Sequence, residues 1–439
     1  MDTTIVAIAT PIGYGGVGII RLSGPTSFNL LNKIFTPIKK ECFSPRKMLF
    51  GTVAFNNIAD DCLAVYFPAP NSFTGEDVVE IQMHGGVALL NETVKQLIEY
   101  GATMAQPGEF SKRAVINGKM DITQAEGLID MIYAQSICEM QVASSQMRGD
   151  LYKKIVDLQN QLTEMMASIE VALDFPEHEE APTEEEITLD LPSLIEDMQH
   201  LVNTEKVGMK LKSGITVALV GEPNVGKSSL LNALVGYDRA IVTEIAGTTR
   251  DTISESYQFN NVRFNIIDTA GLRDSKDIIE QEGIKRTIKT IDECDFVLKI
   301  YESDKKSTEN NFFSSFKHKN FATVLNKCDI KKEVQDNFDI TVSAKNNINI
   351  DNLKQLIYDR TIDKNLISSQ IIITNIRHGE LLKKALISLK NAEKDLKRVS
   401  LDCIAVLIRQ AWDLLGQITG ETSNEKIIDT IFSKFCLGK

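Results

Sequence analysis

The chain has 439 residues, with 60 Asp and Glu against 48 Lys and Arg, which gives a formal net charge of −12 at pH 7. Its length is that of about three domains, and its composition, 43% hydrophobic, is that of a globular protein. The negative charge argues against general nucleic-acid binding, which depends on Lys and Arg, and the seven scattered cysteines argue against a disulfide framework or a zinc site.

The N-terminal part of the chain is rich in short β-like runs that are separated by Gly and Pro. We predict an α+β domain over residues 1–117, with a helix near residues 89–99. Its first residues lack a basic segment, and no apolar run approaches the roughly 20 residues that span a bilayer. We therefore expect a cytoplasmic protein with no signal peptide and no membrane partner.

Helical periodicity follows and later returns. Apolar residues recur every three or four positions from Leu151 to Ile169, which is the spacing of a buried helix stripe. Signals for β and α then alternate, as in a doubly wound parallel sheet, before a second helical region. We predict a helical domain in two halves, residues 118–213 and 362–439, into which an α/β domain, residues 214–361, is inserted.

Residues Gly221–Ser228 match the phosphate-binding pattern G-x-x-x-x-G-K-[ST]. An apolar strand-like run precedes them and a helix-like run follows, which is the context that this motif needs. The glycines let backbone N–H groups surround phosphates at a helix N-terminus. Lys227 is predicted to reach the β- and γ-phosphates, and Ser228 to bind Mg²⁺.

Three later motifs occur in the order found in GTPases. Asp268–Gly271 would place a carboxylate near the metal and a Gly N–H near the γ-phosphate. Asn326–Asp329 supplies the Asp329 carboxylate, which can accept hydrogen bonds from guanine N1–H and N2–H, a pair that adenine does not offer. Ser343–Lys345 would complete the base pocket through backbone N–H groups. These motifs predict that the chain binds and hydrolyses GTP.

The position that orients the attacking water in Ras-like enzymes is altered. Those enzymes carry a Gln directly after the Asp-x-x-Gly motif, whereas this chain has Leu272. Three downstream carboxylates, Asp277, Glu280 and Glu282, are candidates for orienting the water instead. The positive charge that stabilises the transition state could come from Arg250, from Arg273 or from a bound monovalent cation.

The chain resembles the MnmE (TrmE) family of tRNA-modification GTPases along its whole length. The likeness is carried by the Gly221–Ser228 loop, by Ala246–Asp251, by Asp268–Arg273 and by the closing Cys436–Lys439. Further matching residues are Thr10-Pro11, Gly16–Gly18, Ile20–Gly24, Phe73–Asp77, Glu80, His84–Gly86, Pro107–Ser111, Asn117–Lys119, Gln124–Glu126 and Asn375–His378.

This resemblance implies a homodimer that acts with an FAD-containing partner, MnmG, in a heterotetramer or larger complex with tRNA. The reaction adds a carboxymethylaminomethyl or aminomethyl group to C5 of the wobble uridine. A tetrahydrofolate derivative (5-formyl- or methylene-tetrahydrofolate) supplies the one-carbon unit. The N-terminal domain would bind the folate and form the dimer. The folate contacts implied by matching motif are Arg21, Glu80, Lys119 and Lys439.

The resemblance also implies activation by K⁺, with G domains that dimerise across the nucleotide. Glu280 matches the water-organising acid of the family. The K⁺ positions are Asn224, Thr243, Ile245 and Thr248, and the Mg²⁺ positions are Ser228 and Thr249. The implied GTP-binding residues are Asn224, Val225, Gly226, Lys227, Ser228, Ser229, Thr243, Glu244, Ile245, Ala246, Gly247, Thr248, Thr249, Asp268, Thr269, Ala270, Gly271, Asn326, Lys327, Asp329, Ser343, Ala344 and Lys345.

Three alternatives stay open at this point. Cys436 could be a nucleophile near the folate or a packed thiol. The basic stretch 383–398 could be a solvated helix face or a contact with tRNA or a partner. The alternative function is that of a ribosome- or RNA-assembly GTPase of the Era or Der type, against which the N-terminal domain and the Cys436–Lys439 tail argue.

Overall fold

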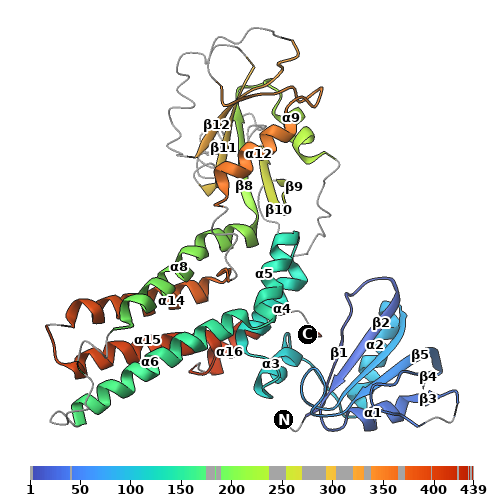
Figure 1. Ribbon diagram of the computed structural model, residues 1–439. Coiled ribbons are helices and arrows are strands. Elements are labelled where there is room, and N and C mark those ends of the chain that lie inside the picture. Colours follow the sequence, from blue (N-terminus) through green and yellow to red (C-terminus); the bar gives the residue numbers. More distant parts are fainter. Residues whose placement is uncertain are drawn as a thin grey trace, which may run out of the picture. The chain divides into compact units, whose positions relative to one another are not determined.

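The computed structural model, whose helices and strands are labelled in Figure 1, divides into two compact units. Unit 1 comprises Met1–Ile129, Gln146–Thr188 and Lys394–Lys439, and unit 2 comprises Asp130–Ser145 and Leu189–Glu393. The residues that the structure describes are 3–39, 42–174, 183, 189–236, 254–268, 293–302, 320–330, 338–363, 371–396, 398–422, 425–433, 435 and 438. Among the described helices, none is long and apolar enough to cross a membrane.

Unit 1 contains a seven-stranded sheet in the order β3-β4-β5-β6-β2-β1-β7. Neighbouring strands are antiparallel except β1 and β7, which are parallel. The strands are β1 (Ile5–Ile8), β2 (Gly15–Ser23), β3 (Phe35–Pro37), β4 (Leu49–Phe55), β5 (Ile58–Phe67), β6 (Val78–Gly85) and β7 (Thr103–Met104). The predicted α+β character of this region is confirmed.

Different helices pack on the two faces of this sheet, and successive side chains of a strand point to opposite faces. Ile20 and Leu22 of β2 point into a core that they share with α1 (Ser27–Ile34) and α2 (Val87–Glu99). Arg21, between them, points to the other face. There α3 (Glu109–Ile116) packs its Phe110 against β1.

The helices of unit 1 come from both ends of the chain. They are α4 (Ile122–Tyr133), whose last turn belongs to unit 2, α6 (Asp150–Asp174), α15 (Leu401–Thr419) and α16 (Glu425–Phe432). Helix α6 packs along α15, and Gln159 Nε2 donates to the Trp412 carbonyl oxygen at 3.4 Å (Figure 1). The predicted stripe from Leu151 to Ile169 is buried.

Unit 2 contains a six-stranded sheet in the order β13-β12-β11-β8-β10-β9, in which only β9 and β10 are antiparallel neighbours. The strands are β8 (Ile215–Gly221), β9 (Ser254–Phe259), β10 (Val262–Asp268), β11 (Phe296–Tyr301), β12 (Phe321–Leu325) and β13 (Ile340–Thr341). Helices α9 (Lys227–Val235) and α12 (Ile350–Thr361) pack with this sheet. The parallel α/β arrangement predicted for this part of the chain is therefore confirmed.

Two long helices of unit 2, α8 (Leu191–Ser213) and α14 (Ile376–Asp395), lie side by side (Figure 1). Lys383 Nζ lies 2.5 Å from Glu205 Oε2, and Lys390 Nζ donates to Gln199 Oε1 at 2.7 Å, so the helices are antiparallel. Helix α5 (Ile137–Met147), most of which belongs to unit 2, completes this part. In each unit a helix that precedes the α/β segment packs against one that follows it, which confirms the predicted discontinuous helical part.

Candidate nucleotide-binding site

The nucleotide motifs follow the C-terminal ends of parallel strands of one sheet. Strand β8 ends at Gly221, β10 at Asp268 and β12 at Leu325. The carboxyl ends of parallel strands meet at one edge of an open sheet, which is where such folds bind ligands. The sheet therefore brings together motifs that lie far apart in the sequence.

The phosphate-binding loop has a backbone that glycine makes possible. Gly226 has φ +91, and a Cβ at this position would lie 2.4 Å from Asn326 Nδ2. Helix α9 begins at Lys227, whose Nζ donates to the carbonyl oxygens of Gly221 and Glu222 at 3.1 and 2.9 Å. The Lys227 ammonium group is thus held over the loop, at the N-terminus of a helix that favours anions.

The buried side chain of Asn326 joins three segments of the site. Its Nδ2 donates to the Val225 carbonyl oxygen at 2.9 Å, and its Oδ1 accepts from the Ala344 N–H at 3.1 Å. The phosphate loop, the Asn326–Asp329 motif and the Ser343–Lys345 motif are therefore cross-linked by one amide. These two bonds use one N–H and one lone pair of the amide, so the predicted contact of Asn326 with GTP stays a prediction.

The Asp329 carboxylate is exposed, as a group that contacts a base must be. A hydrogen bond from the Ser343 side chain, and to a lesser extent the charges of Lys345 and Lys327, lower the pKa of Asp329 below its ordinary value. An ionised carboxylate has two oxygens and can accept two hydrogen bonds. Asp329 and Ser343 are thus within hydrogen-bonding distance, and their predicted contact with the base stays a prediction.

Oxygen ligands for a divalent cation lie together beside the loop. Ser228 Oγ donates to Asp268 Oδ2 at 3.4 Å. Hydroxyl and carboxylate oxygens are the donors that Mg²⁺ prefers, usually with phosphate oxygens and water completing the octahedron. The residues present fit the predicted magnesium ion.

Lys327 makes contacts that the sequence motif did not indicate. Its Nζ donates to the Asn224 carbonyl oxygen at 2.9 Å and lies 2.9 Å from Glu302 Oε1. Glu302 directly follows β11, the strand next to β8. Only the position of Glu302 at the end of a strand-like run could have suggested this role.

Several predicted site residues lie outside the described residues. For the nucleotide and the cations these are Thr243, Glu244, Ile245, Ala246, Gly247, Thr248, Thr249, Thr269, Ala270, Gly271 and Glu280. For the folate region they are Cys436 and Lys439. The roles predicted for them stay predictions.

The predicted folate residues Arg21 and Glu80 are brought together in unit 1. They are direct cross-strand neighbours on β2 and β6, and Arg21 Nη2 lies 2.7 Å from Glu80 Oε1. The Arg21 guanidinium carbon lies 5.7 and 5.8 Å from the ring centroids of Phe73 and Phe110. An ion pair flanked by aromatic rings can hold a flat polar ligand by hydrogen bonding and stacking.

Lys119 and Gly438 also belong to unit 1. The side chain of Lys119 is exposed. It lies close to the Gly75 backbone, because a Cβ built on Gly75 would be 3.4 Å from Lys119 Cγ. Gly438 has φ +88, and a Cβ there would approach the Ile8 carbonyl oxygen of β1 to 2.2 Å. Gly438 therefore packs closely on β1, where only glycine fits.

A buried arginine that the sequence did not single out fixes the loop before β6. Arg113 is 1% exposed, and its guanidinium lies 3.0 Å from Glu76 Oε2 and 2.9 Å from Glu109 Oε1. Ser23 Oγ donates to Glu76 Oε2 at 2.8 Å and lies 2.6 Å from Thr74 Oγ1. This network holds the Phe73–Asp77 segment beside Arg21. The four-residue spacing of Glu109 and Arg113 was its only local signal.

Comparison with known proteins covers the whole chain. The family model of the TrmE N-terminus ("GTP-binding protein TrmE N-terminus") matches residues 4–119, and the model of the MnmE helical domain matches residues 122–436. The protein named tRNA modification GTPase MnmE from Caldicellulosiruptor saccharolyticus is 39% identical, with 99% of each chain covered. This chain belongs to the MnmE family.

Other relatives of that name support the MnmE assignment. Those of Streptococcus thermophilus and Clostridioides difficile are 39% and 36% identical, and the matches cover 99% and 100% of this chain and 98% and 100% of the relatives. Among solved structures, a single-residue variant of Aquifex aeolicus Era bound to GDP·AlF4⁻ is 24% identical with a TM-score of 0.26, covering 39% of this chain and 67% of that one. A score this low supports no conclusion about this MnmE-family chain.

The base pocket yields a specificity prediction. Replacement of Asp329 by Asn should lower GTP affinity by about a hundredfold or more, because hydrogen bonds to a charged acceptor are worth roughly 1.5–3 kcal/mol each. Xanthosine triphosphate should bind better than GTP to this variant, because xanthine offers a C2 carbonyl to the new amide N–H. Equilibrium titration with fluorescent nucleotides measures both. The exposed Asp351→Asn serves as the control, and an unchanged GTP affinity of Asp329→Asn would contradict the proposed base contact.

Proposed function

We propose that this chain is a GTP-hydrolysing enzyme of tRNA modification that acts at C5 of the wobble uridine with the FAD-containing partner MnmG. The observation that carries the proposal is the base and phosphate pocket organised by Asn326, in a chain that matches relatives named tRNA modification GTPase MnmE end to end. The Era- or Der-type alternative has no comparable support, because the match at residues 4–119 is to the TrmE N-terminus.

GTP would be held by groups with separate roles. The Asp329 carboxylate accepts from guanine, the loop N–H groups and Lys227 bind the phosphates, and Ser228 and Asp268 would hold Mg²⁺. This ion, when bound, neutralises charge on the β- and γ-phosphates. Leu272 cannot orient water, so we assign that role to Glu280, directly or through a second water molecule.

A potassium ion would supply the charge that an arginine finger supplies elsewhere. Asn224 has a left-handed backbone, with φ +66, and an exposed side chain beside the phosphate loop. Amide and carbonyl oxygens are the ligands that replace the hydration shell of K⁺. Thr243, Ile245 and Thr248 would complete the site, with Thr249 as a further ligand for Mg²⁺.

The one-carbon chemistry would take place in the N-terminal domain. Arg21 and Glu80, with the rings of Phe73 and Phe110, fit a tetrahydrofolate derivative, whose pterin offers both flat faces and hydrogen-bonding edges. Lys119 and Lys439 would contact its acidic tail, and Cys436 would lie close by. When bound, the folate supplies the one-carbon unit. The chain's residues would bind and orient it.

Dimer formation by the same domain has support from its surface. The loop between β1 and β2 and the start of β2 expose Ile12, Tyr14 and Val17, with relative accessibilities of 71%, 98% and 61%. A cluster of large apolar side chains in water favours an interface. A second copy of the chain would cover this loop in the proposed homodimer.

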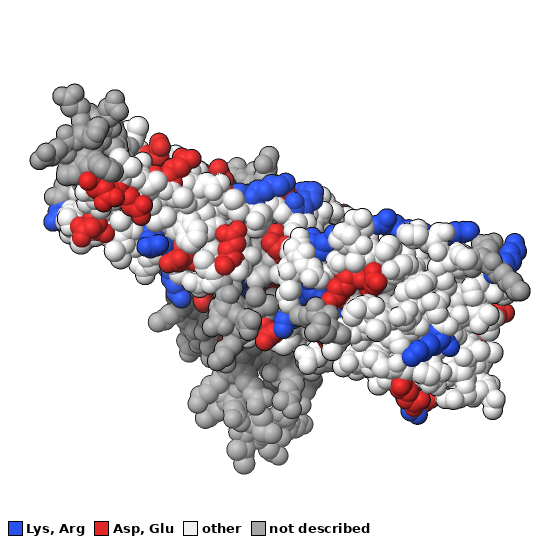
Figure 2. Space-filling view, turned by 90° about the horizontal axis from the view of Figure 1, so that it is seen from below, with Lys and Arg blue, Asp and Glu red and all other residues white. Residues whose placement is uncertain are grey.

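Binding of tRNA would be shared with the partner in the cytoplasm. Figure 2 shows basic side chains interspersed with acidic ones on one face of the molecule, in keeping with the net charge of −12. Phosphate binding relies on concentrated positive charge. A partner that contributes such charge would account for tRNA recognition by this acidic chain.

Potassium should control the rate of hydrolysis. We expect much faster GTP turnover in KCl than in NaCl of equal concentration, because Na⁺ is too small for a site of fixed oxygen ligands. Phosphate release measured in both salts, with nucleotide binding measured in parallel, tests this. Equal rates in the two salts would remove K⁺ from the mechanism.

Glu280 should matter for turnover and not for binding. We expect Glu280→Ala to lower the rate of GTP hydrolysis by about 10²–10⁴-fold, the usual contribution of a positioned acid or base, with GTP affinity preserved. The neighbouring Glu282→Ala should retain near-normal turnover and is the matched control. Loss of GTP affinity in Glu280→Ala would instead make Glu280 a structural residue.

The function itself is tested in cells. Mass spectrometry of tRNA nucleosides from cells that lack this gene should show loss of the C5-modified wobble uridine, and a plasmid copy of the gene should restore it. A plasmid copy with Asp329→Asn should fail to restore it. An unchanged wobble uridine profile in the deletion strain would overturn the proposed function.

A further inference from the structure

The closed end of the β9–β10 hairpin is joined to the turn between α4 and α5 within unit 2. Arg263 of β10 makes the central contact, with its Nε 3.3 Å from Glu139 Oε1 and its Nη1 donating to Gln135 Oε1. Both charged side chains are largely buried, with 14% and 7% exposed. We call the contacts of Gln135, Glu139 and Arg263 the latch.

Backbone groups reinforce the latch. The Cys138 N–H donates to the Asn261 carbonyl oxygen in the hairpin turn at 3.1 Å, and Gln258 Nε2 of β9 donates to the Gln135 carbonyl oxygen at 2.6 Å. Both strands of the hairpin and its turn are therefore bonded to the same short stretch, 135–139. Movement of the hairpin must carry this stretch with it or break these bonds.

Glu139 is held in place from its own side. It accepts hydrogen bonds from the Gln135 N–H at 2.7 Å and from Ser136 Oγ at 3.1 Å, at the beginning of α5. A carboxylate there is stabilised by the helix dipole. Loss of its charge would remove from Arg263 the acidic partner that the described residues provide, which is costly in a site shielded from water.

The connection from α8 to β8 is shaped around the same arginine. Gly214 has φ +76, and a Cβ there would lie 2.9 Å from Arg263 Nε and 2.6 Å from Asn265 Nδ2. Arg263 Nη2 donates to the Lys212 carbonyl oxygen at 3.1 Å, and Asn265 Nδ2 donates to that of Ser213 at 2.9 Å. Because Gly214 has no Cβ, the side chains of Arg263 and Asn265 can pass next to the α8–β8 connection.

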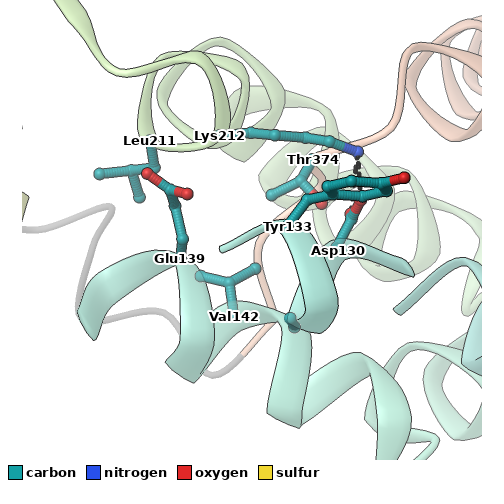
Figure 3. A pocket seen from close by; sticks show the side chains of 8 residues that line it. Asp130, Tyr133, Glu139, Val142, Leu211, Lys212 and Thr374 are labelled. Atoms are coloured by element: carbon teal, nitrogen blue, oxygen red, sulfur yellow. Dashed lines mark hydrogen bonds and ion pairs between the residues drawn. The ribbon is translucent and has the colours of Figure 1, made fainter. Parts of the chain in front are cut away.

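A cavity of about 120 Å³ lies beside the latch (Figure 3). Glu139, Val142 and Tyr133 face it from the α4–α5 side and Leu211 and Lys212 from α8, while Lys212 Nζ lies 2.7 Å from Asp130 Oδ1. The pocket leaves room between α5 and α8, whereas the hairpin side of α5 is bonded to β9 and β10.

The hairpin also connects two segments predicted to contact GTP. Strand β9 begins at Ser254, soon after Thr243–Thr249, and β10 ends at Asp268. We propose that Glu139 and Arg263 are positioning residues that pass a nucleotide-dependent movement of this hairpin to α4 and α5. Helix α4 begins at Ile122, shortly after Lys119, and its last turn lies in unit 2, so the helix itself joins this contact to the segment that carries Lys119.

This inference rests on the proposed function and can be tested apart from it. Hydrogen–deuterium exchange of the full chain, bound to GDP or to a non-hydrolysable GTP analogue with Mg²⁺ and K⁺, should differ at residues 135–147. Glu139→Gln keeps one acceptor oxygen for the Gln135 N–H but removes the charge and the second acceptor, and should abolish this difference. Glu205→Gln, which removes an acid paired with Lys383 between α8 and α14, is the matched control and should retain it.

The functional measurement compares two rates in the same reaction, with tRNA and the FAD-containing partner. For Glu139→Gln and Arg263→Met we expect GTP hydrolysis within about twofold of the unchanged chain and wobble-uridine modification per GTP lower by roughly three- to thirtyfold. In the double variant, wobble-uridine modification per GTP should be no lower than in either single variant, because the same contact between Glu139 and Arg263 is lost in all three. Arg263→Lys, which keeps the charge, should restore part of the lost modification.

Two outcomes would overturn the proposed role of the latch. One is a wild-type chain whose exchange at residues 135–147 is the same with GDP and with the GTP analogue. The other is a folded Glu139→Gln variant with normal modification per GTP. Failure of the unchanged chain to modify tRNA would instead count against the proposed function, and the exchange experiment would still decide the role of the latch.

Discussion

The amide of Asn326 is the contact on which the nucleotide site depends. It bonds the Val225 carbonyl oxygen of the phosphate loop and the Ala344 N–H of the base loop, and Gly226 has no side chain where the amide passes. A buried polar group without a hydrogen bond costs about 1–3 kcal/mol. If either loop moved away, the Asn326 amide would lose a partner, so both loops are held in place together. Phosphate binding and base recognition are thereby made parts of one rigid structure, which the parallel sheet can support because the phosphate loop and the base motifs leave it at the same edge.

The sequence was sufficient where function needs a local pattern. The phosphate loop requires glycines at fixed spacing before a helix, and the base motifs follow apolar strands directly, so Asp329 and Ser343 could be placed together before their contact was seen. Leu151 to Ile169 could be assigned to a buried stripe for the same reason. These features depend on neighbours in the chain, and tertiary contacts did not override them.

Other contacts depend on register and on distant packing, which no local pattern encodes. Glu302 reaches Lys327 only because β11 lies beside β12 in the sheet. Arg113 looks like an ordinary helical arginine until α3 is packed on the sheet and Glu76 is brought against it. Arg21 and Glu80 were named through family resemblance alone, and their pairing follows from the β2–β6 register. The chemistry of a motif is local, whereas the residues that hold it in place are selected by the fold.

The insertion of the α/β segment into a helical chain gives these distant contacts their significance. In unit 2, Gly214 connects α8 directly to the first strand of the sheet, β8. Its positive φ and the side chains packed against it leave no room for a Cβ, so no other residue fits there. Lys210 Nζ, one turn before that joint, lies 3.0 Å from Asp295 Oδ1, and Asp295 Oδ2 accepts a hydrogen bond from the Thr216 N–H of β8 at 3.0 Å. The end of the sheet opposite the nucleotide motifs is therefore bonded to helices by charged and amide groups, while its other end carries the phosphate-binding loop. Movement of this end of the sheet would therefore have to carry α8 with it or break those bonds.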